Sequence, residues 1–352
     1  MNGHQRIHAA LQGTQPDTVP IMLHSFMLAA RESGYSMQQF RNDPVVIAES
    51  FIKSIETYNY DGILVDIDTV TLAGALGVPI EFMDDDPATS YLGCLDSLKN
   101  VGNLPPPDIG AYKNVQIWLE AVTKLKSYFG DEIFIRGNCD QAPFSLASMM
   151  RSPQEWFMDL IRAPELAIEL LEYCTQAVCQ FVDLMSETGA HMISNGDSPA
   201  GPELISPDMY KKFALPFEQR VIKTAHKHGL PYALHICGNT DAILDAMVDT
   251  GADAFELDYK TDIRLARKIF AGKATFIGNI DPVGVLQYGS REEVASATRN
   301  LLELFYDIPR FILNAGCSIP ADTPEQNIKT MVETARHFEH GIITHEEGTK
   351  NE

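Results

Sequence analysis

One short stretch of the sequence carries two side chains that could bind a metal ion. Residues 232–239 form an apolar run that ends in His235 and Cys237, just before a glycine turn. Alternate residues of a β-strand point to the same face, so these two side chains project together at the end of a strand. An imidazole beside a thiolate supplies half of a zinc site.

Cys317 is a third candidate ligand, far along the chain. It follows an apolar strand pattern and Gly316, in the same position relative to its strand that Cys237 has. Taken singly, each of these residues is more often a core side chain, since free cysteine is often buried. Together, His235, Cys237 and Cys317 would hold zinc with a fourth position open, which is the arrangement of catalytic zinc sites. The grouping therefore favours a metal.

The elements that must position these residues alternate between short apolar runs and longer amphipathic segments. Eight such alternations without a low-complexity linker predict an α/β protein, a single (β/α)8 TIM barrel covering 1–352. We expect a helical lead-in over about 1–18, a long irregular loop over about 81–111 and a C-terminal tail over about 342–352. The predicted strands are 19–23, 61–66, 133–138, 191–195, 232–237, 252–257, 274–279 and 311–314.

Two of the predicted helices have clear start signals. Pro44 at a first helical position predicts a helix to about Tyr58. Ser206, followed by a proline and an aspartate, predicts one helix that continues to Gly229.

Polar residues gather after the predicted strands, where a TIM barrel carries its chemistry. A purely structural barrel would not require them, so we expect an active site at this end. They are His24, Ser25, Asp66, Asp68, Asn138, Cys139, Asp140, Gln141, Asn195, Asp197, Ser198, His235, Cys237, Asn279, Asp281, Asn314 and Cys317.

Composition excludes several classes of partner. The formal net charge of -21 argues against a nucleic-acid backbone or an anionic membrane. The six cysteines form no CxxC pair and no disulfide-framework spacing, which indicates a reducing compartment. No apolar run approaches the ~18 residues of a membrane span, and residues 1–20 contain no signal-peptide core. We expect a soluble cytoplasmic protein.

Several motifs resemble the uroporphyrinogen decarboxylase superfamily, along nearly the whole chain. They are Asp-Ile-Asp-Thr at 66–69 with Ala-Leu-Gly at 75–77, Ile-Gly-Asn-Ile-Asp-Pro at 277–282, Leu-Asn-Ala-Gly-Cys at 313–317 and Thr-Pro-Glu-Gln-Asn at 323–327.

The superfamily has two chemically distinct branches. The decarboxylases carry an arginine pair soon after the first strand, whereas here only Arg31 lies nearby, and they place a histidine where this chain has Cys317. Their pyrrole-binding aspartate is matched by Asp68. The zinc-dependent corrinoid methyltransferases carry His-x-Cys and a later Gly-Cys as metal ligands, which 235–237 and 316–317 match.

The resemblance therefore implies a zinc-dependent methyltransferase. It would move a methyl group between a corrinoid (cobalamin) and a thiol such as coenzyme M, or a methylated substrate such as a methyl ether; both directions need the same ligands. This chain shows no corrinoid-binding Asp-x-His-x-x-Gly motif, so we expect the corrinoid on a partner protein. A homodimer is implied only by the decarboxylase branch.

Other residues receive provisional roles. Asp68 is a candidate catalytic residue, and His24, Asp197 or Glu203 could fill the fourth zinc position. The candidate cofactor or substrate contacts are Asn195, Asp197, Asn279 and Asp281, although the last two are equally explained by a turn ahead of Pro282. Two alternative functions stay open: a metal-free uroporphyrinogen decarboxylase that depends on Asp68, and a non-catalytic protein that binds a corrinoid or tetrapyrrole.

Overall fold

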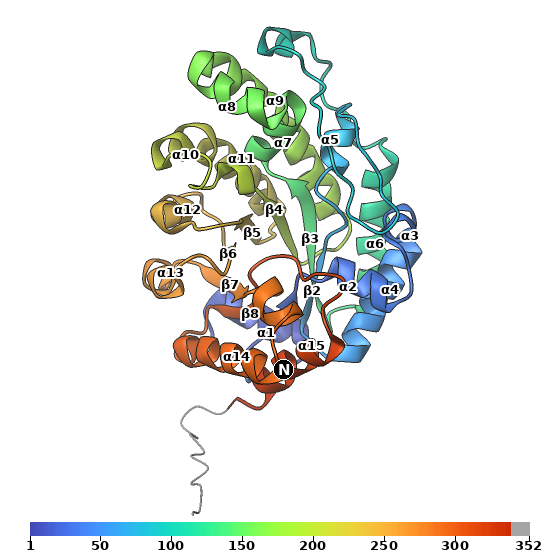
Figure 1. Cartoon of the computed structure of the whole chain (residues 1–352), viewed down its shortest axis with the longest axis vertical. Helices are drawn as coiled ribbons and strands as arrows, with labels where there is room; N and C mark the ends of the chain where they lie inside the picture. The colour runs from blue at the N-terminus through green and yellow to red at the C-terminus, as the bar shows by residue number, and fades with distance from the viewer. Residues whose placement is uncertain (339–352) are drawn as a thin grey trace, which may run out of the picture.

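The computed structural model describes residues 1–338 and confirms the predicted (β/α)8 barrel. The eight strands form one parallel sheet in chain order, and a bridge between Ile21 and Leu313 joins the last strand to the first. Figure 1 shows the helices following one another round this sheet in chain order. The strands are β1 (Met22–Leu23), β2 (Gly62–Val65), β3 (Phe134–Gln141), β4 (Met192–Gly196), β5 (Tyr232–Ile236), β6 (Ala254–Leu257), β7 (Thr275–Ile280) and β8 (Phe311–Ala315).

The helices fill the connections between these strands. The α-helices are α1 (Gly3–Gln12), α2 (Phe26–Glu32), α3 (Met37–Asn42), α4 (Pro44–Tyr58), α5 (Thr71–Ala75), α6 (Lys113–Phe129), α7 (Pro143–Arg151), α8 (Pro153–Arg162), α9 (Pro164–Ser186), α10 (Pro207–Phe213), α11 (Leu215–Lys227), α12 (Leu244–Val248), α13 (Ile263–Phe270), α14 (Arg291–Phe305) and α15 (Glu325–Arg336). Short 3-10 turns η1 (Leu98–Asn103), η2 (Ser198–Ala200) and η3 (Asp241–Ile243) and a π-helical turn η4 (Pro282–Gln287) complete the set.

Three boundaries differ from the sequence predictions. The single helix predicted from 206 to 229 is wrong, since α10 and α11 are separate helices that meet at Ala214. Pro216 explains the break, because it has no amide hydrogen and so cannot continue the helical hydrogen bonds of α10; it is instead tolerated in the first turn of α11. Strand β3 runs on to Gln141, past the predicted end at 138, whereas β1 is only two residues long. The predicted tail over 342–352 lies outside the described residues.

The predicted irregular segment over 81–111 contains little regular structure. A short antiparallel bridge joins Glu81 to Thr89, and η1 provides its one helical turn. The buried Arg41 donates hydrogen bonds to the backbone carbonyls of Met83 and Asp86, so a cation inside the protein holds this loop in place.

The barrel interior has an apolar end and a polar end. At the amino-terminal ends of the strands, α1 packs Ile7, Ala10 and Leu11 against an apolar layer. Two residues further along several strands the inward side chain is polar, because alternate strand residues share a face. The apolar layer comprises Met22, Phe134, Met192, Ala233, Ala254, Ile277 and Ile312, and the polar positions two residues further on include His24, Arg136, Ser194, His235 and Glu256.

Within residues 1–338, no helix combines the length and apolar character needed to cross a membrane.

Candidate metal centre

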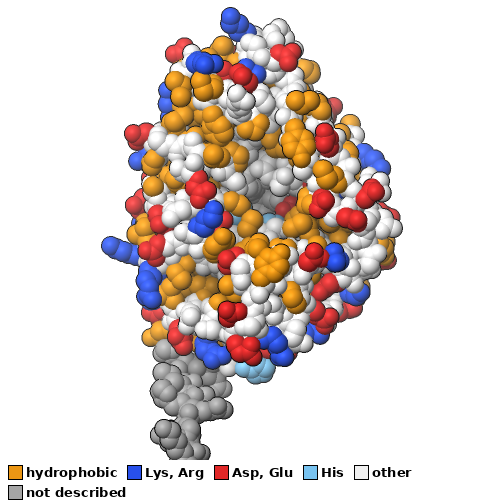
Figure 2. Space-filling view, viewed as in Figure 1, with side chains coloured by type: hydrophobic (Ala, Val, Ile, Leu, Met, Phe, Trp, Pro, Cys, Tyr) orange, Lys and Arg blue, Asp and Glu red, His pale blue; other side chains and the backbone are white. Residues whose placement is uncertain are grey.

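A cavity of about 240 Å³ lies at the carboxyl-terminal ends of the strands. Figure 2 shows a hollow near the middle of this face, with both apolar and acidic side chains around it. Many of the polar residues that the sequence places after strands line this cavity, which supports the expectation of a site at this end. These lining residues are His24, Asp66, Asp68, Asn138, Gln141, Asn195, Ser198, His235, Cys237 and Cys317.

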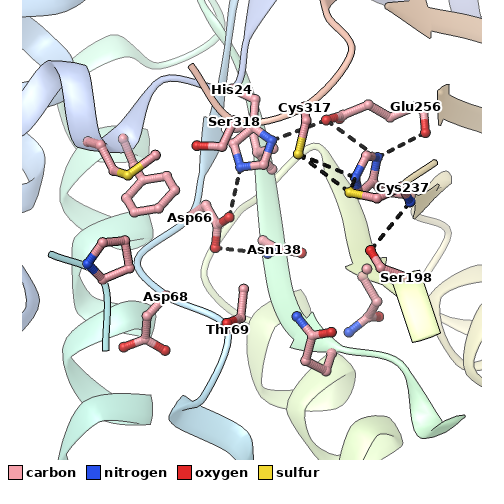
Figure 3. Close-up of a pocket in the computed structure, with 18 of the residues that line it drawn as sticks. His24, Asp66, Asp68, Thr69, Asn138, Ser198, Cys237, Glu256, Cys317 and Ser318 are labelled. Atoms are coloured by element: carbon pink, nitrogen blue, oxygen red, sulfur yellow. Dashed lines mark hydrogen bonds and ion pairs between the residues drawn. The ribbon is translucent and has the colours of Figure 1, made fainter. Parts of the chain in front are cut away.

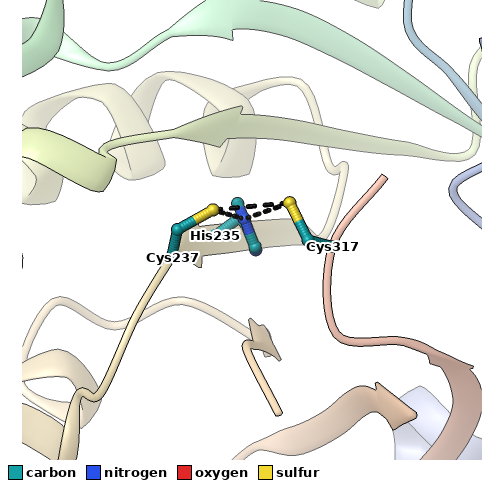
Figure 4. Close-up of side chains that lie close together, drawn as sticks. All are labelled: His235, Cys237 and Cys317. Atoms are coloured by element: carbon teal, nitrogen blue, oxygen red, sulfur yellow. Dashed lines mark hydrogen bonds between the residues drawn. The ribbon is translucent and has the colours of Figure 1, made fainter. Parts of the chain in front are cut away.

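His235, Cys237 and Cys317 come together on one side of this cavity (Figure 4). The Nε2 atom of His235 lies 2.8 Å from the Sγ atom of Cys237 and 3.9 Å from that of Cys317, and the two sulfur atoms are 3.5 Å apart. His235 lies on β5, and Cys237 is the first residue after this strand. Cys317 follows β8. The fold thus brings together the three predicted ligands.

Two glycines, each adjacent in sequence to one of the cysteines, allow the two cysteine side chains to come close together. Gly238 has φ +84°, a conformation that L side chains rarely adopt, so the chain can turn directly after Cys237. Gly316 lies so close to the backbone of the β6 loop that a Cβ atom would approach the amide nitrogen of Tyr259 to 2.5 Å. A side chain at position 316 would therefore displace the backbone directly before Cys317.

The distances between the donor atoms fit a tetrahedral zinc ion. Zn–S bonds of about 2.3 Å and Zn–N bonds of about 2.0 Å place neighbouring donor atoms roughly 3.5–3.8 Å apart. The distance of 3.5 Å between the two sulfur atoms lies in this range, and the distance of 3.9 Å between His235 and Cys317 lies just above it. The distance of 2.8 Å between His235 and Cys237 would have to increase by about 0.7 Å. Two thiolates and a neutral imidazole would leave the zinc site formally neutral.

Hydrogen bonds and charges among the three side chains shift their pKa values. The pKa of Cys237 is lowered to about 3, chiefly by a hydrogen bond from the Cys317 thiol and also by the neighbouring His235. Burial lowers the pKa of His235, but the negative charge on Cys237 outweighs this effect and raises the pKa to about 10. The same contact with Cys237, together with burial, raises the pKa of Cys317. A divalent cation would replace the protons that hold these groups together.

The hydrogen bond on the other ring nitrogen of His235 fixes its orientation. Its Nδ1 atom lies 3.0 Å from the backbone carbonyl oxygen of Glu256. A carbonyl oxygen can only accept, so Nδ1 carries a proton, and a cation that replaced the proton on Nε2 would meet a lone pair directed at the two sulfur atoms. This is the arrangement that orients metal-binding histidines.

Glu256 also anchors a buried chain of charged side chains that runs along the cavity (Figure 3). Its carboxylate pairs with Arg136 and accepts a hydrogen bond from His24 Nδ1 at 3.2 Å. His24 Nε2 lies 2.9 Å from Asp66, which accepts a further hydrogen bond from Asn138 at 3.0 Å. Each charge therefore has a hydrogen-bonded partner of opposite sign.

The chain of partners shifts two pKa values in opposite directions. Burial opposes the charge on Glu256, but Arg136 and His24 outweigh it and lower the pKa of this carboxyl group. Burial likewise opposes the charge on His24, whereas its hydrogen bonds to Asp66 and Glu256 raise its pKa to about 9. At neutral pH His24 is therefore an imidazolium.

Sequence reasoning missed Glu256 and Arg136. Each occupies an inward position in an otherwise apolar strand, and both are almost completely buried. A charged residue inside an apolar strand pattern was the available signal, since such side chains are rarely buried without a partner.

The structure places none of the three proposed fourth ligands in the cluster. Both ring nitrogens of His24 are engaged by carboxylates. Asp197 accepts hydrogen bonds from the backbone and hydroxyl of Ser145, and Glu203 pairs with Lys260 at 3.5 Å. Within residues 1–338, the candidate metal group at this end of the barrel contains only His235, Cys237 and Cys317.

The four candidate cofactor contacts are dispersed. Asn195 lines the cavity and accepts a hydrogen bond from Tyr232 at 2.7 Å. Asp197 is buried behind it, whereas Asn279 and Asp281 line a separate surface hollow. Asp281 caps η4 by accepting hydrogen bonds from two backbone amides, as the turn interpretation expects. The structure does not bring these four residues together.

Asp68 lies on the cavity wall and is almost completely buried. Its Oδ1 atom accepts hydrogen bonds from the amides of Val70 and Thr71 and from the Thr71 hydroxyl. Its Oδ2 atom has no hydrogen-bond partner within the described part of the chain. Burial raises the pKa of this carboxyl group.

Comparison with known proteins identifies the family. A profile of the uroporphyrinogen decarboxylase (URO-D) family matches residues 2–338. The chain belongs to this family. The resemblance expected from the sequence motifs is therefore confirmed.

Within the URO-D family, the chain is similar to two named methyltransferases. It is 34% identical over 226 residues to the methylcobamide:CoM methyltransferase MtbA of Methanosarcina acetivorans, covering 64% of this chain and 65% of MtbA, just under two thirds of that relative. It is 26% identical over 331 residues to the methylcobamide:CoM methyltransferase MtaA of Methanosarcina barkeri, covering 93% of this chain and 95% of MtaA.

The fold is also that of a solved structure, a methyltransferase from Methanosarcina mazei. The TM-score is 0.88 at 22% identity, and the match covers 96% of this chain and 98% of that one.

Proposed function

We propose that this chain is a zinc-dependent methyltransferase that transfers a methyl group between a corrinoid, carried by a partner protein, and a small thiol. The grouping of His235, Cys237 and Cys317 on the wall of a cavity is the observation that carries the proposal. Three donors that meet at a cavity wall leave one side of a bound ion open to a substrate, as in catalytic zinc sites.

Zinc in this position would deprotonate an incoming thiol and hold it as the nucleophilic thiolate. The protein's own contribution is to fix the ligands. The Glu256 carbonyl group holds the His235 ring, and Cys237 is further positioned by a hydrogen bond from its amide to the Ser198 hydroxyl at 3.3 Å. Phe26, Met27, Leu64 and Pro87 supply apolar wall that keeps bulk water from the sulfur atoms.

The size of the cavity supports placing the corrinoid outside the pocket. Drug-sized ligands occupy pockets of about 300–1,000 Å³. A cavity of about 240 Å³ lies below this range and is large enough for a short thiol. The methyl group would then be exchanged at the mouth of the barrel with a corrinoid presented there by its carrier.

Free methylcobalamin provides the test without the partner protein. Purified chain loaded with zinc should demethylate methylcobalamin in the presence of a small thiol, detected by the absorbance change of the corrinoid. Cys317→Ser should abolish bound zinc and transfer. The matched control is Cys94→Ser, because Cys94 lies outside the metal group. Zinc-free protein of full activity would contradict the proposal.

A second candidate, uroporphyrinogen decarboxylase, is favoured by one observation. The unpartnered Oδ2 atom of Asp68 at the cavity wall could accept a hydrogen bond from a pyrrole N–H group. Formation of coproporphyrinogen, retained in Cys237→Ala and lost in Asp68→Asn, would support this alternative. Tight corrinoid or tetrapyrrole binding without turnover, unaffected by Cys237→Ala, would instead support a non-catalytic protein.

A further inference from the structure

The cavity beside the metal group contains more carboxylates than cationic side chains. Its acidic residues are Asp66, Asp68 and Glu256, and its permanently charged base is Arg136, joined by the His24 imidazolium. With zinc bound, the two thiolates offset the charge of the metal. The lining then carries one carboxyl group more than it has cations.

Each cation in the lining already has an acidic partner. The Arg136 guanidinium donates to Glu256, and the side chains of both residues are almost completely buried. His24 lies between Glu256 and Asp66, with both ring nitrogens engaged. An anion entering the cavity would have to compete with a carboxylate for either group.

Among the described residues, Arg136 is the one arginine that lines the cavity. No lysine lines the cavity. Lys260 pairs with Glu203 near the turn that follows Cys237. Arg41 does not line the cavity; it donates to the backbone carbonyls of the loop at 83–86, and its buried Nε atom has no partner among the described residues. A sulfonate buried here would lose its hydration without gaining a free counter-charge, which is unfavourable.

Asp68 is the carboxyl group of the lining that pairs with neither Arg136 nor His24. One of its oxygens is saturated by three hydrogen bonds, and the other is buried and unpartnered. Figure 3 shows Asp68 on the opposite side of the pocket from the sulfur atoms of Cys237 and Cys317. A molecule bound through sulfur at the metal would therefore extend across the cavity toward a group that attracts cations and hydrogen-bond donors.

We propose that this pocket selects a small thiol whose far end is neutral or cationic, and that it discriminates against the sulfonate of coenzyme M. The inference rests on the proposed function and sharpens its substrate class. It separates this chain from the acceptor printed in the names of the relatives MtbA and MtaA. Asp68 is the residue that sets the preference.

Three thiols with the same two-carbon skeleton test the proposal: 2-aminoethanethiol (cationic), 2-mercaptoethanol (neutral) and 2-mercaptoethanesulfonate (anionic). Calorimetric titration of the zinc-loaded protein gives a dissociation constant for each thiol. Because the three thiols have different pKa values, each constant is calculated for the concentration of the thiolate form. We expect the cationic thiol to bind at least about 10-fold more tightly than the sulfonate, which corresponds to about 1.4 kcal/mol. Rates of methylcobalamin demethylation should follow the same order.

Asp68→Asn tests the assigned residue, because it keeps the Oδ1 acceptor and removes the charge. The ratio between the cationic and anionic thiols should shrink by about 10-fold in this variant. Asp85→Asn, in the exposed loop and outside the cavity lining, is the matched control and should leave the ratio unchanged. The wild-type ratio is measured without any variant, so a folding defect in Asp68→Asn does not remove the test.

The outcomes separate this inference from the function on which it rests. Methyl transfer with equal or tighter binding of the sulfonate overturns the charge preference and leaves the methyltransferase proposal standing. An equal effect of Asp68→Asn on all three thiols overturns the role of Asp68. Absence of bound zinc and of transfer with every thiol overturns the proposed function, and the inference with it.

Discussion

Among the described residues, two groups of side chains lie close enough together to share a metal ion, and they lie at opposite ends of the barrel. The upper group is His235, Cys237 and Cys317, on the cavity at the carboxyl ends of the strands. The lower group is His4, Asp131 and His191, at the amino-terminal ends of β3 and β4. Each group offers three atoms that could bind a metal ion, but the residues around the two groups differ.

The difference lies in the second nitrogen of each histidine ring. His235 Nδ1 donates its proton to the Glu256 carbonyl oxygen, so Nε2 is the nitrogen that a metal ion could bind once it replaces the second proton of the ring. His191 Nδ1 instead accepts a hydrogen bond from the Ile135 amide at 2.9 Å. An amide can only donate, so the proton of a neutral His191 must be on Nε2, the atom that faces Asp131.

The lower group also contains a cation already. Lys126 pairs with Asp131 and lies 2.8 Å from His191 Nε2. Burial and this ammonium group lower the pKa of His191 to about 4. Proximity of ligand-type residues is therefore not sufficient for a metal site: the neighbouring donors and acceptors decide whether a lone pair is free.

The sharpest test of this contrast removes one histidine from each group. His235→Ala should abolish bound zinc, with a loss of affinity beyond the 10–100-fold that is typical for outer-shell changes. His191→Ala should leave zinc content unchanged at about one per chain. Elemental analysis and competition with a chelator measure both. Equal loss of zinc in the two variants would show that the groups are not distinguished as we describe.

A second comparison removes one cation from each end. Arg136→Met leaves the buried Glu256 carboxylate without its guanidinium and should cost about 3–5 kcal/mol of unfolding free energy. Lys126→Met breaks a pair whose Asp131 side chain is 74% exposed, and should cost no more than about 1 kcal/mol. Urea denaturation of the two variants beside wild type gives both values. Similar losses would contradict the difference in burial.

The two ends should also respond oppositely to pH. The pKa of His24 is raised from 6.5 to about 9, so its stabilising charge is present below pH 6.5 and is lost as the pH rises through 9. The pKa of His191 is lowered from 6.5 to about 4, so its contribution is lost as the pH falls through this range.

Single variants separate these two effects in a pH series of melting temperatures. His24→Asn should flatten the alkaline side of the stability profile, and His191→Asn the acidic side. If His24→Asn altered only the acidic side, the assigned imidazolium would be wrong.

The smallest expected effect is an absence of change. Lys126→Met removes the competing cation from the lower group but leaves the Ile135 amide on His191 Nδ1. Zinc should therefore stay near one ion per chain. A second bound ion, detected by titration with zinc in this variant and absent in wild type, would show that the lysine alone prevents metal binding there.

The contrast between His235 and His24 shows how far sequence reasoning could reach. The proximity of His235, Cys237 and Cys317 follows from local patterns, because a two-residue spacing on a strand and a position after a strand fix where a side chain points. His24 has the same kind of position, and the sequence made it a candidate ligand. Its ring is instead hydrogen-bonded to Asp66, which directly follows β2, and to Glu256 on β6.

The sequence by itself determined the barrel, its eight strands and the three sulfur and nitrogen donors, because hydrophobic periodicity and strand-end positions are local properties. Only the tertiary structure decided which charges pair. Arg136 and Glu256 are 120 residues apart and meet through the closure and register of the whole sheet. The same closure leaves Asp68 as the carboxyl group of the lining that pairs with neither Arg136 nor His24. It also places the Ile135 amide at Nδ1 of His191, so the proton of the neutral ring is on Nε2, the nitrogen that faces Asp131. Such partners depend on distances in three dimensions, which no spacing along the chain encodes.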